Sequence, residues 1–289
     1  MSLNLGILLA LTCAVATQLG FLYKHKGANL APTVEIRHPL RTAKRLYSSK
    51  WFAVGMGIAT VAWLFHVAAL AFAPLSVVQA VLSTGVVILA VLAERIFGFE
   101  VGLRQWIGVA MTALGLLLLV ITLPATHGAH SAYSLVGMIA FEGGMLAIGA
   151  VLIGGKHLGV PAHHSGIMLG AAAGVLFGVS DIAIKALTGA GGVTGVLGSP
   201  WLAVAGIASV IAFFASARGM QEGEAVPVIA ATSTAANVSC ILGGIVVFGD
   251  PMPTDAVGIS VQVFAFILVI AAALVTPPRL EAAAATARA

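Results

Sequence analysis

The amino-acid sequence predicts an all-α integral membrane protein with nine transmembrane helices, built as two inverted four-helix repeats joined by one helix. Three observations predict this fold: the apolar composition, a series of long apolar segments, and a repeat between the two halves. Hydrophobic residues make up 60% of the 289 positions and charged residues only 8%, and the mean hydropathy is +1.08. Soluble domains carry about 25% charged residues. This chain therefore cannot cover a water-facing surface, and we expect it to lie in a lipid bilayer.

Nine apolar segments are long enough to cross a bilayer as helices, which takes about 20 residues each. They cover residues 3–22, 51–72, 74–96, 104–123, 132–153, 166–187, 200–218, 226–247 and 256–275. The segments do not alternate in polarity as the strands of a membrane barrel would. In the first segment the positive charges, Lys24 and Lys26, follow the apolar stretch. A signal peptide has its charge before that stretch, so we expect a retained span.

Lysine and arginine residues gather in the segments that would lie on one side of the membrane. Thirteen of the fourteen fall there, and the opposite connections, 124–131, 188–199 and 248–255, have none. The thirteen are Lys24, Lys26, Arg37, Arg41, Lys44, Arg45, Lys50, Arg95, Arg104, Lys156, Arg218, Arg279 and Arg288. Because basic connections stay in the cytoplasm, we expect the N-terminus outside and the C-terminus inside, in the plasma membrane. The net charge of +4 therefore does not indicate nucleic acid as a partner.

The two halves of the chain match each other at a constant offset. Residues 51–65 (WFAVGMGIATVAWLF) match 201–215 (WLAVAGIASVIAFFA), 81–85 (VLSTG) match 231–235 (ATSTA), and 106–109 match 256–259. The single transmembrane domain, 1–289, then divides into a first repeat (1–123), a connecting helix (132–153), a second repeat (166–275) and a cytoplasmic tail (276–289). One helix between two four-helix units inverts the second unit in the membrane. Inverted repeats are typical of secondary transporters, which bind substrate near the midplane where the halves meet.

These segments resemble the drug/metabolite transporter superfamily (EamA-like). In residues 75–120 a span ends near an acidic residue, Glu94, and a short loop leads to a glycine-containing span. Residues 226–275 repeat this pattern, with Asp250 near the acidic position. Within the superfamily the chain looks most like the NIPA-type magnesium transporter branch, through its nine spans, its basic connection after the first span and AFAP at 71–74. The resemblance implies the nine-span fold and, as substrate, a small solute or Mg²⁺.

Glu142 is the first candidate site residue, because no other charge lies between residues 132 and 155. A carboxylate at the bilayer centre costs roughly 2.5 kcal/mol or more. One interpretation is a group that couples transport to a proton or cation. The other is a neutral acid bonded to a neighbouring helix, and the adjacent Gly143 and Gly144 predict a close helix crossing there.

Asp181 and Lys185 stand four residues apart in the segment 166–187, on one helix face. They form either an internal salt bridge, with Lys185 reaching outward to the interface, or a pair that opens for a substrate or proton. His66 and Gln79 are expected in the outer half of their spans, where the histidine either bonds a helix backbone or contacts substrate. Gln18 carries little weight, because it lies near the inner end of its span.

Hydroxyl side chains occupy matched places in the two repeats. They are Ser83, Thr84, Thr232, Ser233 and Thr234, and Asn237 follows them with an amide. An inverted two-fold axis would bring these residues together at the midplane, as the lining of a cavity. Alternatively, each hydroxyl bonds back to its own helix.

Three functions remain open on these residues. The first is a transporter of a small organic solute, with proton coupling as an option. The second is a magnesium transporter, with Glu142 and Asp181 as the metal ligands, because Mg²⁺ prefers carboxylates and retained water. The third is a scaffold that does not transport, and a homodimer stays open in each case. The chain has no GxSxG, HExxH or GxxxxGK[ST] motif, so we expect neither an enzyme nor a cofactor.

Overall fold

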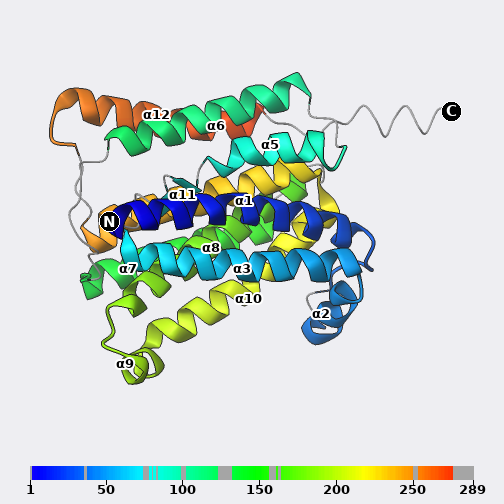
Figure 1. The fold of residues 1–289 in the computed structure, drawn as a ribbon, viewed down its shortest axis with the longest axis horizontal. Coiled ribbons are helices and arrows are strands. Elements are labelled where there is room, and N and C mark those ends of the chain that lie inside the picture. The colour runs from blue at the N-terminus through cyan, green and yellow to red at the C-terminus, as the bar shows by residue number, and fades with distance from the viewer. Residues whose placement is uncertain are drawn as a thin grey trace.

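The protein is α-helical in the computed structural model (Figure 1). The structure describes residues 2–35, 38–73, 78–79, 81–82, 84–98, 102–122, 132–155, 161, 164–249 and 253–275, and no strand occurs in these ranges. The helices are α1 (Ser2–Asn29), α2 (Pro39–Tyr47), α3 (Lys50–Phe72), α5 (Gly85–Arg95), α6 (Leu103–Thr122), α7 (Leu135–Ile153), α8 (Ser165–Thr188), α9 (Val193–Gly198), α10 (Pro200–Glu222), α11 (Ala225–Phe248) and α12 (Ala256–Val275).

Six of the described helices are long and apolar enough to cross a membrane, which confirms an all-α membrane protein. These candidate spans are Asn4–Asn29, Lys50–Phe72, Leu135–Ile153, Ser165–Thr188, Pro200–Glu222 and Ala225–Phe248. The predicted spans 104–123 and 256–275 coincide with α6 and α12, helices of 20 residues each. The predicted span 74–96 is covered in part by α5, while 74–77, 80 and 83 lie outside the described residues.

The connection expected at 23–50 is mostly helical, which corrects the sequence-based boundaries. α1 continues to Asn29, so Lys24 and Lys26 lie within a helix rather than in a loop. α2 starts with Pro39 and buries only Thr42 and Leu46, which are one turn apart. α2 contains few apolar residues, so a search for membrane spans does not find it. It packs through one narrow face of the helix.

Close helix packing organises the bundle. α1 packs along α3, while α8 packs along both α10 and α11, and α6 pairs with α12 (Figure 1). Glycines allow these approaches: a Cβ atom on Gly27 would lie 2.2 Å from Phe52 N, and one on Gly174 would lie 2.2 Å from Thr232 O. The same relation occurs in both halves, since α1 contacts α3 and α5 as α8 contacts α10 and α11.

The buried apolar side chains form one large cluster toward each end of the bundle. One cluster includes Leu46, Phe52 and Met220, at the end where α1 and α10 finish and α2 lies. The other includes Leu70 and Ile182, toward the opposite end. We call the first end the basic end, because the described basic residues of α1, α2 and the start of α3 lie there.

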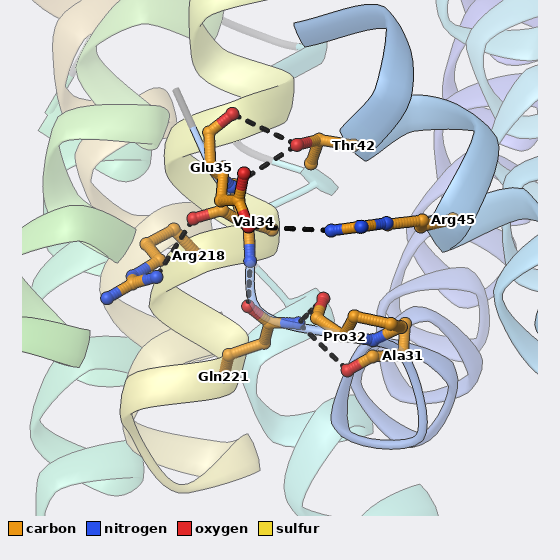
Figure 2. A network of polar contacts seen from close by, with 8 residues as sticks. All are labelled: Ala31, Pro32, Val34, Glu35, Thr42, Arg45, Arg218 and Gln221. Atoms are coloured by element: carbon orange, nitrogen blue, oxygen red, sulfur yellow. Dashed lines mark hydrogen bonds and ion pairs between the residues drawn. The ribbon is translucent and has the colours of Figure 1, made fainter. Parts of the chain in front are cut away.

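The segment 31–35 docks onto α10 at the basic end (Figure 2). Val34 N donates a hydrogen bond to Gln221 Oε1 at 2.8 Å, and Arg218 Nη1 donates one to Val34 O at 2.9 Å. Gln221 Nε2 in turn donates to Ala28 O at 2.9 Å and to Pro32 O at 3.1 Å. The chain between α1 and α2 is thereby tied to the far end of α10, in the other half of the sequence.

Candidate functional site

A cavity of about 380 Å³ lies between α1, α3, α8, α10 and α11. Pockets of about 300–1,000 Å³ are typical of small-molecule sites. Apolar and aromatic side chains make up much of its wall, and its largest polar side chains are Gln18, Lys24, His66, Gln79, Asp181 and Asn237. The cavity therefore combines residues from both predicted repeats.

His66 and Asp181 meet in the wall of this cavity. His66 Nε2 lies 3.4 Å from Asp181 Oδ2, and the two side chains are 7% and 20% exposed. This separation suits an ion pair, although the angle between the two groups does not meet the geometry of a hydrogen bond. The Cys240 thiol also lies 3.7 Å from Asp181 Oδ2. The carboxylate thus stands between an imidazole from α3 and a thiol from α11, and one side of it faces the cavity.

Amide and hydroxyl side chains extend the polar part of the wall. Gln18 Nε2 donates a hydrogen bond to Ser233 Oγ at 3.2 Å, while Gln18 Oε1 and Gln79 Nε2 have no partner among the described residues. Thr232 also lines the cavity, and its hydroxyl donates to Val228 O of its own helix at 2.9 Å. Unpartnered buried amides carry a free-energy cost. They are therefore the groups most ready to bond a ligand.

Lys24 lines the cavity toward the basic end. It is 8% exposed, and its Nζ lies 3.8 Å from the centre of the Phe21 ring. Cys13 and Lys24 both line the cavity, and the helical rise of 1.5 Å per residue separates them by about 16 Å along α1. The cavity therefore runs along the bundle axis beside α1.

Glu142 lies outside this cavity. It is buried in α7, 3% exposed, and neither carboxyl oxygen has a hydrogen-bond partner among the described residues. It is within electrostatic reach of Cys240, the residue that also contacts Asp181. The close helix crossing expected at Gly143 and Gly144 is wrong, because a Cβ atom at either position would meet open space. The close approaches occur along α8 instead, where the glycines face α10 and α11.

Lys185 is fully buried, so its side chain does not reach outward to the interface as one interpretation expected. It is 1% exposed, and its Nζ donates a hydrogen bond to Leu70 O at 3.2 Å. Leu70 lies in the last turn of α3, where carbonyl groups lack helical partners and attract cations. Lys185 therefore ties α8 to the end of α3 and lies outside the cavity lining.

The remaining hydroxyl candidates do not gather in the cavity. Thr84 is exposed, and its hydroxyl donates to Val81 O at 2.7 Å, while Thr234 lies outside the lining. Ser83 lies outside the described residues. Among the described hydroxyl candidates of the two repeats, Thr232 and Ser233 of the second repeat therefore line the cavity.

Sequence reasoning underrated Gln18 and Lys24, although a signal was present. Residues 13, 14, 17, 18, 21 and 24 of α1 all line the cavity, and their spacing of three and four marks one face of a helix. Cys13, Thr17, Gln18 and Lys24 are the polar members of this face. A polar stripe that reaches the end of a span indicates a water-filled or ligand-filled interior.

The described lining suits a solute that carries polar groups better than it suits a bare metal ion. Among the described lining residues, Asp181 supplies the one carboxylate, and Lys24 supplies an amino group farther along the same cavity. Within the described part of the chain no group of three or more histidine, cysteine, aspartate or glutamate side chains could hold a metal ion. The wall can therefore bind a solute with a polar group at one or both ends and an apolar middle.

Comparison with known proteins gives one curated relative. A protein of Arabidopsis thaliana, described as a probable magnesium transporter NIPA9, is 23% identical over 292 residues, which cover 95% of this chain and 83% of the relative. The resemblance to the NIPA-type branch that the motifs indicate is thereby confirmed. No protein-family profile and no solved structure match the chain.

Proposed function

We propose that this protein is a secondary transporter of the drug/metabolite type that moves a small organic solute through the central cavity by alternating access. One observation carries the proposal: a cavity with polar groups of both signs lies in the middle of an apolar membrane bundle. Polar side chains at membrane depth are costly, and they mark substrate paths where they line an interior.

The proposed architecture is nine spans in two inverted repeats, with α7 as the connecting helix. It is supported by the constant sequence offset and by the matching helix contacts in the two halves. In this proposal the N-terminus lies outside and the C-terminus lies in the cytoplasm of the plasma membrane. The basic residues of α1, α2 and the start of α3, which gather at one end of the bundle, support this orientation. Alternating access then consists of one half rocking against the other around the cavity.

The chemistry of the lining favours an organic solute. Aromatic rings surround the cavity, and amides and hydroxyls provide hydrogen bonds without a full charge. Mg²⁺ loses its waters reluctantly and prefers carboxylate ligands, whereas a buried lysine faces the same space. An apolar wall with a few convergent polar groups is the usual form of a small-molecule site.

Magnesium transport is the second candidate, and the description of the Arabidopsis relative favours it. Hydrated Mg²⁺ would be held by Asp181 together with the amides of Gln18, Gln79 and Asn237, which line the same cavity. Glu142 would attract the cation from the neighbouring helix. Proton coupling, under either candidate, would use His66 and Asp181, because one proton decides whether the pair is charged.

The test is transport by the purified protein in liposomes that enclose a magnesium-sensitive or a pH-sensitive dye. The variants are Asp181→Asn, Glu142→Gln and, as a matched control, Asp255→Asn. Asp255 caps the start of α12 by accepting a hydrogen bond from Gly258 N at 2.7 Å, which an asparagine can also accept. Losing a charged contact of about 1.5–3 kcal/mol corresponds to a flux reduced roughly tenfold to a hundredfold.

The outcomes separate the candidates. Proton movement that follows addition of an organic solute, and that Asp181→Asn abolishes, supports the first candidate. Magnesium influx that Asp181→Asn abolishes and Asp255→Asn retains supports the second. A folded wild-type protein that moves neither a panel of solutes nor Mg²⁺ overturns the transporter proposal and leaves a scaffold. Loss of flux in Glu142→Gln alone would assign the coupling role to Glu142.

A further inference from the structure

We propose that the basic end of the central cavity is a binding site for the acidic group of a small organic acid, with Lys24 as its counter-charge. The proposal rests on the proposed function in taking the cavity for the substrate site, and it adds the chemical class of the substrate. Lys24 and the aromatic side chains around it carry the argument.

Lys24 is a buried lysine without an anionic partner. Among the described residues its Nζ makes neither a hydrogen bond nor an ion pair, and its close contact is the ring of Phe21 at 3.8 Å. A ring face attracts an ammonium group but accepts none of its three hydrogens as an oxygen would. An ammonium group removed from water without such acceptors is costly. An anion in the cavity would remove that cost.

The second repeat provides an internal comparison. When GILLALTCAV (6–15) of α1 is matched to GIMLGAAAGV (166–175) of α8, Lys185 stands one residue from the place that corresponds to Lys24, and both lysines are buried. Lys185 finds an oxygen acceptor in the carbonyl of Leu70, at the end of α3. Lys185 is thus bonded to the protein and lies outside the cavity lining, whereas Lys24 lines the cavity.

The surroundings of Lys24 suit an organic acid better than a bare inorganic anion. Ser216, which is 4% exposed, lines the same cavity, and its hydroxyl has no partner among the described residues. The rings of Phe21, Phe52 and Phe213 also face this space. A hydroxyl donor and an ammonium group that line the same cavity can both bond an acidic group, and the aromatic wall recognises the apolar part attached to it.

The experiment measures binding rather than transport. Purified protein in an uncharged detergent is heated with 3-phenylpropionate or with 3-phenylpropionamide, which has a similar shape but no charge. Hexanoate and hexanamide form a second pair. A ligand that binds only the folded protein raises the unfolding temperature, and at one ligand concentration it does so by more when its affinity is higher. The variants are Lys24→Met and the control Lys26→Met, which removes an exposed lysine that contacts the ring of Trp51 at 4.2 Å.

We expect both acids, and neither amide, to stabilise the wild type and Lys26→Met. Lys24→Met should bind the acids at least about tenfold more weakly, because the charge-assisted contact is lost. Equal effects of acid and amide on the wild type, or equal binding by Lys24→Met, would overturn the proposal. Binding of acids that depends on Lys24, without any flux in liposomes, would uphold this site and reject the transport function instead.

Discussion

Glu142 is a buried acid whose two carboxyl oxygens have no hydrogen-bond partner among the described residues. A buried polar group without a partner costs about 1–3 kcal/mol. Glu142→Met keeps a similar volume and removes the polar group, so the variant should raise the free energy of unfolding by about 1 kcal/mol. Thermal unfolding in detergent measures this change. A fall in stability would instead reveal a partner for the carboxyl group in the folded protein.

One segment of sequence is enough to identify a polar residue at membrane depth. It is not enough to predict which residue of another helix that group will contact. The sequence alone marked His66 and Asp181 as membrane-depth polar groups, and both line the cavity. Their pairing at 3.4 Å joins α3 to α8, and no local spacing encodes that contact. Helical spacing suggested Lys185 as the neighbour of Asp181, and the structure gives Lys185 a bond to Leu70 O.

At the scale of elements, the glycines of α8 let this helix pack closely against α11, and both helices line the cavity. A Cβ atom on Gly174 would lie 2.2 Å from Thr232 O of α11, whereas one on Gly143 of α7 meets open space. Gly174→Ala should therefore destabilise the protein by about 1–3 kcal/mol, because the backbones must separate. Gly143→Ala should stabilise it by up to about 1 kcal/mol, since alanine favours helix more than glycine does.

The two glycine variants are compared by their unfolding temperatures in one detergent. Equal temperatures would show that α8 and α11 can separate at no cost.

The sequence predicted the long helices because nearly all of their residues are apolar, but it assigned the close crossing to Gly143 and Gly144. It also missed α2 and the last turns of α1. Those turns lie against Phe52 of α3, a contact that only the folded chain defines.

For the whole molecule, alternating access requires that one end of the cavity closes while the other opens. In this structure the segment 31–35 is bonded to Gln221 and Arg218 of α10 at the basic end (Figure 2). These bonds join the two halves of the chain, so they should break when the cavity opens toward the basic end. Gln221→Ala removes the four hydrogen bonds that its side chain makes with Val34, Ala28, Ala31 and Pro32.

Cys13 reports on this opening without any knowledge of the substrate, because it lines the cavity and is 3% exposed. A thiol reagent that cannot cross the membrane, added on the side of the basic end, should modify Cys13 several-fold faster in Gln221→Ala. Thr42→Ala is the control, because it removes bonds between α2 and Glu35 within one half, and it should not change the rate. Cys13→Ala identifies the modified residue. Faster modification only from the opposite side would mean that the bonds of Gln221 hold the basic end open, because closing one end and opening the other are the same motion.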